Sequence, residues 1–467
     1  MTRRVAIVGD GISGLVAALR LRQALGADAQ IDIFADGERP GGVLRTVEVG
    51  GAMVDVGAEA FIVRRPEALD LVTELGLADR VVAPTSRRPA IFAGGDLHPL
   101  PAPAFMGIPA GAQAMAGVAD PADLARIEAE PQRPLHWSPG TDVSVGELVA
   151  DRFGPSVVAR SVDPMLGGVY SSLAADIGVR EAVPALAARL DAGAPSLTSA
   201  VGDLLGAAPG SGPVFGTLLG GYRVLVDALI DAARPQLRRS SAVTDLRRAG
   251  DRWLLLAENQ PAVDDPTYDG VVLAVPAWMA GHLLRRAAPD IAPQLLAVER
   301  ASSVVVSMAL APGTELPPHS GVLVATGEDL RAKAFTFSSE KWAHLSRPDR
   351  PVSVRASFGR YGAPVPDACV EPGIDDAVRS WALDDLDAVC AAAGVAPPSA
   401  RMVEVYLQRW SGGLPRYAPG HLAQMAQVLT SRPRRLALAG SSYAGVGVPA
   451  CIAQAGRAVA DLLADLG

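Results

Sequence analysis

The chain has 467 residues, of which 49% are hydrophobic and 20% charged, and its 50 acidic against 42 basic side chains leave a formal net charge of −8. This composition excludes a disordered protein, and the acidic balance argues against nucleic acid as a partner. Three widely spaced cysteines, Cys369, Cys390 and Cys451, form neither a disulfide framework nor a metal-ligand motif, so we expect a reducing compartment and no metal site. The length predicts about two or three domains.

The first predicted element is a Rossmann-like strand, turn and helix. An apolar strand at residues 4–8 leads into the spacing Gly9-x-Gly11-x-x-Gly14, and residues 15–25 have helical apolar spacing. The first glycine makes the turn, the second lets a pyrophosphate approach the backbone, and the third packs the helix against the strand. Asp10 interrupts the apolar run, so a strand and turn explain it better than an export signal does.

A second strand at residues 31–34 should end in an acid that binds an adenosine ribose, about 20 residues beyond the glycine turn. Ala35 occupies that position, and Asp36 follows it. Either Asp36 takes over the contact through a small shift, or the ribose contact is weakened.

The longest uncharged run lies between Asp96 and Asp120 and contains four prolines. So many helix breakers exclude a membrane-spanning helix. We expect this run to form a buried loop; an apolar surface that rests on a membrane or a partner is the alternative.

A region of helical pattern is followed by segments that are mostly β-patterned. Helices are predicted at residues 144–153, 184–190 and 222–233, with a Gly/Pro/Ser-rich hinge at 206–216. Strands are predicted at residues 242–247, 253–258, 271–274, 302–310, 334–338 and 352–358. The end of the chain returns to strand, glycine turn and helix, at 436–439, 440–447 and 452–466. Both termini therefore look like pieces of one nucleotide-binding unit, interrupted twice.

Five further motifs carry a resemblance to a known family. Residues 38–46 supply a second glycine turn with Arg45, and residues 55–59 read Asp-Val-Gly-Ala-Glu. Gly-Gly-Tyr at 220–222, the strand at 268–276 and the glycine-rich string at 439–452 complete the pattern. The chain resembles the FAD-dependent amine oxidase and protoporphyrinogen oxidase superfamily, whose members bury an extended FAD beneath two glycine turns.

Within that superfamily, four strings are similar to the bacterial porphyrinogen oxidases, especially the Gram-positive branch that acts on coproporphyrinogen III. They lie at residues 98–101, 163–170, 335–344 and 409–421. Ala35 departs from the family pattern, and so does Arg416, which stands where glutamine is usual. The first departure bears on FAD affinity and the second on local structure near the flavin.

The resemblance implies a mixed α/β and α+β fold: a discontinuous Rossmann-like FAD-binding domain, a β-rich substrate domain and a helical subdomain. The FAD-binding domain would comprise residues 1–86, 217–282 and 402–467. The substrate-binding domain would comprise residues 87–103, 201–216 and 283–401. Residues 104–200 would form the helical subdomain, which could face a membrane.

The resemblance also implies the residues that hold FAD, without a covalent link because no cysteine or histidine falls in a recognisable flavin-attachment motif. The expected contacts are Gly9, Gly11, Ile12, Ser13, Gly14, Asp36, Gly42, Val43, Arg45, Gly57, Ala58, Glu59, Ala60, Val243, Trp410, Val446, Gly447 and Val448. Val243 and Trp410 could instead be ordinary core residues.

The implied reaction is the six-electron oxidation of coproporphyrinogen III in heme biosynthesis, in three hydride transfers to flavin N5, with O₂ reduced to H₂O₂; protoporphyrinogen IX is the alternative substrate. Gly167 and Gly168 are expected on a loop facing the tetrapyrrole, with a helix-terminating turn as the alternative. Arg64 and Arg65 would bind the extra propionates, with Arg45 and Lys341 as inner contacts, unless the first pair is only a solvated helix start. The expected location is cytoplasmic, with peripheral membrane contact and transient contact with the next heme-pathway enzyme left open.

Two other interpretations remain. An amine oxidase often uses a lysine near flavin N5, and Lys333 and Lys341 are the only lysines in the chain. A non-catalytic binding protein of the same fold, like the prenyl-binding GDP-dissociation inhibitors, would have lost its flavin contacts, whereas Val446-Gly447-Val448 is retained.

Overall fold

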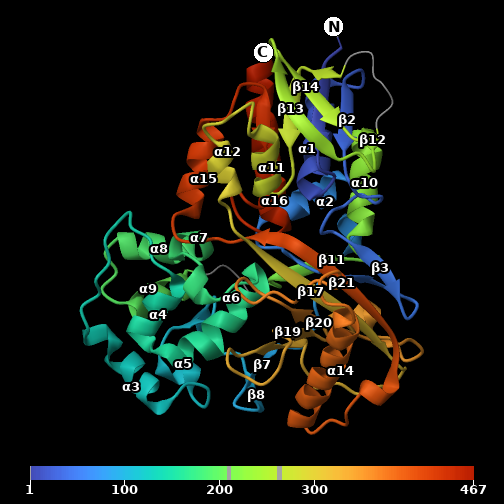
Figure 1. Ribbon diagram of the computed structural model, residues 1–467. Helices are drawn as coiled ribbons and strands as arrows, with labels where there is room; N and C mark the ends of the chain where they lie inside the picture. Colours follow the sequence, from blue (N-terminus) through green and yellow to red (C-terminus); the bar gives the residue numbers. More distant parts are fainter. Residues whose placement is uncertain (1, 208–211, 260–265) are drawn as a thin grey trace.

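The computed structural model describes residues 2–207, 212–259 and 266–467, which form three packed parts (Figure 1). Both ends of the chain lie in one part, at the top of the view. A group of helices occupies the lower left, and a large sheet backed by one long helix, α14, occupies the lower right. The mixed architecture predicted from the sequence is confirmed.

A parallel sheet organises the part that contains the termini. Its strand order is β12-β2-β1-β16-β22, and all four pairings are parallel. The strands are β1 (Arg4–Val8), β2 (Gln30–Phe34), β12 (Gln236–Arg238), β16 (Gly270–Leu273) and β22 (Leu436–Leu438). Residues from the start, middle and end of the chain thus build one sheet, as the sequence predicts.

Helices and a small sheet cover the two faces of this parallel sheet. The helices α1 (Ile12–Leu25), α2 (Pro66–Glu74), α10 (Arg223–Ala233) and α16 (Val448–Leu466) bury their apolar side chains on one face. The other face packs against α11 (Ala277–Leu284), α12 (Ala292–Leu296), α15 (His421–Thr430), β13 (Val243–Ala249), β14 (Arg252–Ala257) and β15 (Thr267–Tyr268). α16 begins four residues before the predicted helix start at 452, because Pro449 is well suited to a first helical turn.

The large sheet has seven strands in the order β21-β17-β20-β19-β18-β7-β8. The strands are β7 (Ala90–Ala93), β8 (Asp96–Pro99), β17 (Arg300–Leu310), β18 (Gly321–Val324), β19 (Ala334–Thr336), β20 (Val352–Phe358) and β21 (Met402–Pro415). Its apolar core includes residues of α14 (Ile374–Ala392). The last predicted FAD-binding segment starts at residue 402, where β21 also begins. β21 nevertheless pairs with β17 in the large sheet.

The helical part contains α3 (Pro121–Ala129), α4 (Val145–Phe153), α5 (Pro155–Val157), α6 (Asp163–Tyr170), α7 (Val179–Ala182), α8 (Pro184–Asp191) and α9 (Leu197–Gly206). Helix α4 starts where expected, because Ser144 and Glu147 form a reciprocal capping box. The uncharged run includes β9 (Ala104–Phe105) and β10 (Ile108–Pro109), and its Ile108 and Met115 are fully buried in the core of this part. Part of the run is thus packed, as a buried loop predicts, while Pro99, Ala102 and Pro103 are exposed. Among the helices in the described ranges, none is long and apolar enough to cross a bilayer.

Short strands connect the three parts. The hairpin β3 (Thr46–Val49) and β4 (Ala52–Asp55) packs against β17, and a small sheet joins β5 (Phe61–Ile62), β11 (Phe215–Leu218) and β6 (Val81–Val82). The short helix α13 (Ser338–Lys341) follows β19. The segment after β4 therefore lies between the parallel sheet and the large sheet.

Candidate active site

The first glycine turn has the geometry of a dinucleotide cradle. Gly9 has φ +104°, and a Cβ added there would lie 2.4 Å from the Ala274 carbonyl oxygen. A Cβ on Gly14 would lie 1.9 Å from the Gly9 carbonyl oxygen, so only glycine allows α1 to approach β1 this closely. At Gly11 the nearest atom to such a Cβ is Gly42 Cα at 3.9 Å, so this side of the turn is open. The open side is what a pyrophosphate needs in order to reach the backbone.

The second glycine turn lies directly against the first. Gly41 N–H donates to the Asp10 carbonyl oxygen over 3.0 Å, and a Cβ on Gly42 would lie 3.1 Å from Gly11 Cα. Val43 is 42% exposed, a large fraction for an apolar side chain. Arg45 Nε is buried and has no hydrogen-bond partner among the described residues. A buried Nε–H without a partner fits an anionic group such as a pyrophosphate.

The predicted C-terminal glycine turn is held in place by Tyr417, which lies in the family-like string at residues 409–421 but was not predicted as a site residue. The Tyr417 hydroxyl donates to the Ser441 carbonyl oxygen over 2.6 Å and accepts the Gly445 N–H over 2.7 Å. Gly447, with φ +94°, then precedes α16. The start of α16 lies beside the start of α1, where Ser13 contacts the Cys451 thiol. Val446, Gly447 and Val448 therefore stand close to the first glycine turn.

The segment after β4 brings together two predicted flavin contacts. A Cβ on Gly57 would lie 1.9 Å from the Val43 carbonyl oxygen and 3.1 Å from Trp410 Cζ2. Trp410 Nε1–H donates to the Val56 carbonyl oxygen over 2.9 Å. Trp410 thus packs against this segment from β21. The second glycine turn, residues 57–60 and Trp410 form one continuous wall.

Glu59 stands at the centre of a buried ionic cluster. Lys341 Nζ donates to Glu59 Oε2 and Ser338 Oγ donates to Glu59 Oε1, each over 2.8 Å. Arg355 lies 3.7 Å from the same carboxylate and also donates to the Gly57 carbonyl oxygen over 2.8 Å. Burial by itself would raise the pKa of Glu59, but Lys341, Arg355 and the hydrogen bonds lower it to about 2. The carboxylate is therefore ionised at neutral pH.

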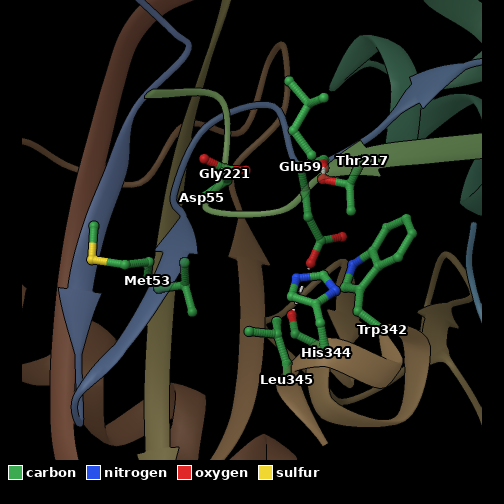
Figure 2. A pocket seen from close by; sticks show the side chains of 11 residues that line it. Met53, Asp55, Glu59, Thr217, Gly221, Trp342, His344 and Leu345 are labelled. Atoms are coloured by element: carbon green, nitrogen blue, oxygen red, sulfur yellow. Dashed lines mark hydrogen bonds between the residues drawn. The ribbon is translucent and has the colours of Figure 1, made fainter. Parts of the chain in front are cut away.

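A small cavity adjoins this cluster (Figure 2). The Glu59 carboxylate points toward the rings of His344 and Trp342. Burial lowers the pKa of His344, against the opposing charge of Glu59, and so favours the neutral imidazole. Asp55, which also lines the cavity, has a pKa raised to about 6 because burial outweighs its bonds from Thr46 and Tyr222. Ser338 and His344 lie in the family-like string at residues 335–344 but were not predicted as site residues, and the sequence offered no signal for Arg355.

The structure places the predicted substrate contacts in different settings. Gly167 and Gly168 lie inside α6 and not on a loop, because the preceding π-helical turn at Val158–Val162 runs directly into α6. The expectation of a loop was therefore wrong. Gly168 is exposed, and a Cβ there would meet only Leu323 Cδ2, at 3.9 Å. Because Gly168 has no side chain, the backbone of α6 is uncovered on the side that faces β18.

Arg64 and Arg65 immediately precede α2, which begins at Pro66. This is the position expected if the two arginines form a solvated helix start. Arg65 pairs with Glu67 over 2.8 Å, and Arg64 donates to the Gly212 carbonyl oxygen over 3.2 Å. Lys341 is bound to Glu59, as described above. Of the remaining predicted contacts, Asp36 is exposed just beyond β2, and Val243 begins β13.

The comparisons with known proteins agree with this geometry. The family described as flavin containing amine oxidoreductase matches residues 12–463. A protein named coproporphyrinogen III oxidase from Mycobacterium leprae (strain TN) is 47% identical over 470 residues, covering 100% of this chain and 99% of its own. A protein of the same name from Staphylococcus aureus (strain NCTC 8325 / PS 47) is 25% identical over 100% of both chains.

Solved structures share the whole fold. A structure from Exiguobacterium sp. 255-15, whose name places it with the protoporphyrinogen oxidases, superimposes with TM-score 0.85 at 26% identity and covers 100% of this chain and 99% of its own. Reduced UDP-galactopyranose mutase superimposes with TM-score 0.72 at 17% identity and covers 99% and 94% of the two chains, a likeness of fold alone. The chain belongs to the flavin-containing amine oxidoreductase family.

Proposed function

We propose that this flavin enzyme is an FAD-dependent coproporphyrinogen III oxidase of heme biosynthesis. The observation that carries the proposal is 47% identity over the full chain to mycobacterial proteins of that name. The open side of Gly11 and the unpartnered Arg45 Nε support FAD, because both suit a pyrophosphate. The overall reaction would convert coproporphyrinogen III and three O₂ into coproporphyrin III and three H₂O₂.

FAD would supply the redox chemistry, accepting a hydride from the macrocycle at each of three turnovers and passing the electrons to O₂. The protein then has to position the two reactants and exclude water. Trp410 and the Gly57 segment close the wall behind the second glycine turn. The exposed Val169 and the bare Gly168 on α6 offer an apolar surface for a flat ring system.

We also propose that FAD is held without a covalent bond. Cys451 is the cysteine near the first glycine turn, and burial raises its pKa to about 11, against the opposing effects of Ser13 and Arg65. A thiol with such a pKa carries almost no thiolate at neutral pH and is a poor nucleophile. Acid precipitation should therefore release the yellow colour into the supernatant, whereas colour in the denatured pellet would contradict this proposal.

Substrate choice depends on cations, because coproporphyrinogen carries four propionates and protoporphyrinogen two. Arg64 and Arg65 remain the proposed outer contacts, although Arg65 would have to leave Glu67. Arg45 remains a proposed inner contact, while Lys341 is occupied by Glu59. A cytoplasmic location and transient contact with the next enzyme of the pathway stay predictions of the sequence.

The experiment that tests the function compares both porphyrinogens, prepared anaerobically, with equal enzyme on admission of air. Porphyrin fluorescence should rise faster with coproporphyrinogen, with three H₂O₂ formed per porphyrin. Faster oxidation of protoporphyrinogen would favour the alternative substrate. A yellow protein that oxidises neither would indicate a different flavin oxidase.

A further inference from the structure

The carboxyl ends of three neighbouring parallel strands meet at the place where a Rossmann fold holds the adenosine ribose. Gly9, just after β1, donates its N–H to the Phe34 carbonyl oxygen at the end of β2, over 2.8 Å. Ala35, just after β2, donates to the Arg238 carbonyl oxygen at the end of β12, over 3.0 Å. The residues that follow these strands therefore stand in the lateral order Asp10, Ala35, Arg239.

Ala35 itself cannot bind a ribose. Its methyl side chain is 8% exposed and has no polar atom, and its backbone groups are bound to Arg238 and Ser241. Asp36 is the next acid along the chain, but its side chain is exposed to solvent. A hydrogen bond from a ribose to an exposed carboxylate competes with water and contributes little.

Asp10 is a different kind of acid. It stands inside the glycine turn, and among the described residues no side chain hydrogen-bonds its carboxyl group. Burial raises the pKa of Asp10 to about 6, against the lowering effects of its own backbone N–H and of Arg239. Because β2 lies between β1 and β12, the attraction between Asp10 and Arg239 acts across the end of β2, where Ala35 stands.

The half-buried carboxylate of Asp10 has its own backbone N–H as a donor and no side-chain donor among the described residues. Removing it from water is unfavourable unless hydrogen-bond donors replace the water. An ionised carboxylate accepts but cannot donate, so it fits two hydroxyl groups and repels a phosphate. The vicinal hydroxyls of a ribose have this chemistry, and the phosphates of the same cofactor would lie at Gly11 and the start of α1 instead.

We propose that Asp10, within the glycine turn, binds the adenosine ribose hydroxyls of FAD and so replaces the acid that is missing at Ala35. This inference rests on the proposed use of FAD. It makes Asp10 a binding residue that selects the ribose of the cofactor, and it takes the ribose contact away from Asp36.

The test compares FAD with an FAD analogue whose adenosine lacks the 2′-hydroxyl. Both are titrated into flavin-free protein, and quenching of flavin fluorescence gives each dissociation constant. The proteins are wild type, Asp10→Ala, Asp36→Asn and, as a matched control, Glu38→Gln, which neutralises an exposed acid of the same loop. Thermal unfolding of each flavin-free protein verifies that it is folded.

Wild type should bind FAD at least fivefold more tightly than the analogue. Asp10→Ala should bind FAD at least tenfold more weakly than wild type and should bind the two flavins equally, while Asp36→Asn and Glu38→Gln keep the wild-type preference. A preference that survives in Asp10→Ala, or is lost in Asp36→Asn, would overturn the assignment, as would a wild type without preference. A wild type that binds neither flavin would instead overturn the proposed use of FAD.

Discussion

Lys341 donates a hydrogen bond to Glu59 over 2.8 Å, joining α13 to the segment after β4 across 282 positions of the chain. Ser338 and Arg355 approach the other oxygen of the same carboxylate. The lysine is thus a partner of Glu59 and not a free cation beside the flavin. This arrangement argues against an amine oxidase interpretation of Lys341, in which the amine would have to order a water at flavin N5.

Replacing Lys341 with methionine should destabilise the fold. The substitution removes a charged hydrogen bond from a carboxylate that stays buried, so we expect unfolding free energy to fall by about 1–3 kcal/mol. Urea unfolding at pH 7 measures the change. Glu59→Gln and the double variant complete a double-mutant cycle, which gives the interaction energy between Glu59 and Lys341. An unfolding free energy that does not change in Lys341→Met would show that the contact contributes nothing to stability.

The pair of Glu59 and Lys341 also predicts how stability changes at acid pH. The folded pKa of Glu59 is about 2 and its ordinary value 4.5, so its stabilising contribution is complete above about pH 4.5 and is lost as pH falls toward 2. Lys341→Met should flatten the stability curve in this window, because the pKa of Glu59 moves back toward its ordinary value. A curve with the wild-type slope between pH 4.5 and pH 2 would count against the assignment.

Lys333 should titrate far below an ordinary lysine. Its ammonium group is buried, donates to Ser171 Oγ and to the Gly359 carbonyl oxygen over 2.6 Å each, and lies near the positive charge of Arg360. Burial first and Arg360 second lower its pKa from 10.5 to about 7. Because the chain has only two lysines, ¹³Cε-labelled lysine should give two NMR resonances, one of which titrates near pH 7 and disappears in Lys333→Met.

The lowered pKa of Lys333 also determines how the unfolding free energy changes with pH. Between pH 7 and pH 10.5 the unfolded chain binds more protons at Lys333 than the folded chain does, so Lys333 makes stability rise with pH in that window. Lys333→Met should remove this rise. A lysine resonance that titrates only near pH 10.5, or an unchanged pH dependence in the variant, would contradict the prediction.

The nucleotide-binding core could be predicted because its determinants are local. The spacing of Gly9, Gly11 and Gly14 follows from one strand-to-helix turn, and the observed close approaches at Gly9 and Gly14 are those the motif requires. Helix α4 was likewise encoded by its own cap at Ser144. Signals of this kind lie within a few residues of the element they specify.

The rest of the site depends on contacts between distant segments. Glu59 with Lys341, Gly57 with Trp410, and Tyr417 with the Ser441–Gly445 turn each join residues that no periodicity links. The resemblance placed Gly167 and Gly168 on a loop, whereas the structure has them in α6. Packing in the helical part overrides the low helix propensity of two adjacent glycines.

Tyr417→Phe should loosen the C-terminal glycine turn. The hydroxyl is both donor to Ser441 and acceptor from Gly445, and its loss leaves a backbone N–H and a carbonyl oxygen without that partner. We expect a loss of about 1–3 kcal/mol in unfolding free energy and weaker flavin binding, measured by urea unfolding and flavin titration. Tyr170→Phe is the matched control, because its ring lies 5.7 Å from that of Tyr417 while its hydroxyl bonds no described residue. Equal effects of the two variants would show that the Tyr417 hydroxyl is not the cause.

Gly11→Val should give a folded protein without flavin. Gly11 has φ −70° and ψ 179°, which valine adopts readily, and no described atom lies closer than 3.9 Å to its added Cβ. The side chain would then occupy the space where a pyrophosphate meets the backbone.

Gly14→Ala is the contrasting variant, since its Cβ would lie 1.9 Å from the Gly9 carbonyl oxygen and should destabilise the flavin-free fold itself. The ratio of flavin to protein absorbance and the unfolding temperature separate the two outcomes, and a Gly11→Val protein with full flavin content would refute this placement of the cofactor.

Gly168→Ala tests whether the exposed end of α6 contacts the substrate. The added Cβ meets only Leu323 Cδ2, at 3.9 Å, which is ordinary van der Waals contact. Alanine in place of a helical glycine should stabilise the protein by up to about 1 kcal/mol, and less near the helix end. Flavin content should stay unchanged. If the flat macrocycle lies against this bare surface, the methyl group should raise KM severalfold or lower kcat.

Gly202→Ala is the matched control, because Gly202 is an exposed glycine of α9 with nothing within 4 Å of its added Cβ. It should bring a similar gain in stability with wild-type kinetics, and identical kinetics in both variants would place the substrate elsewhere.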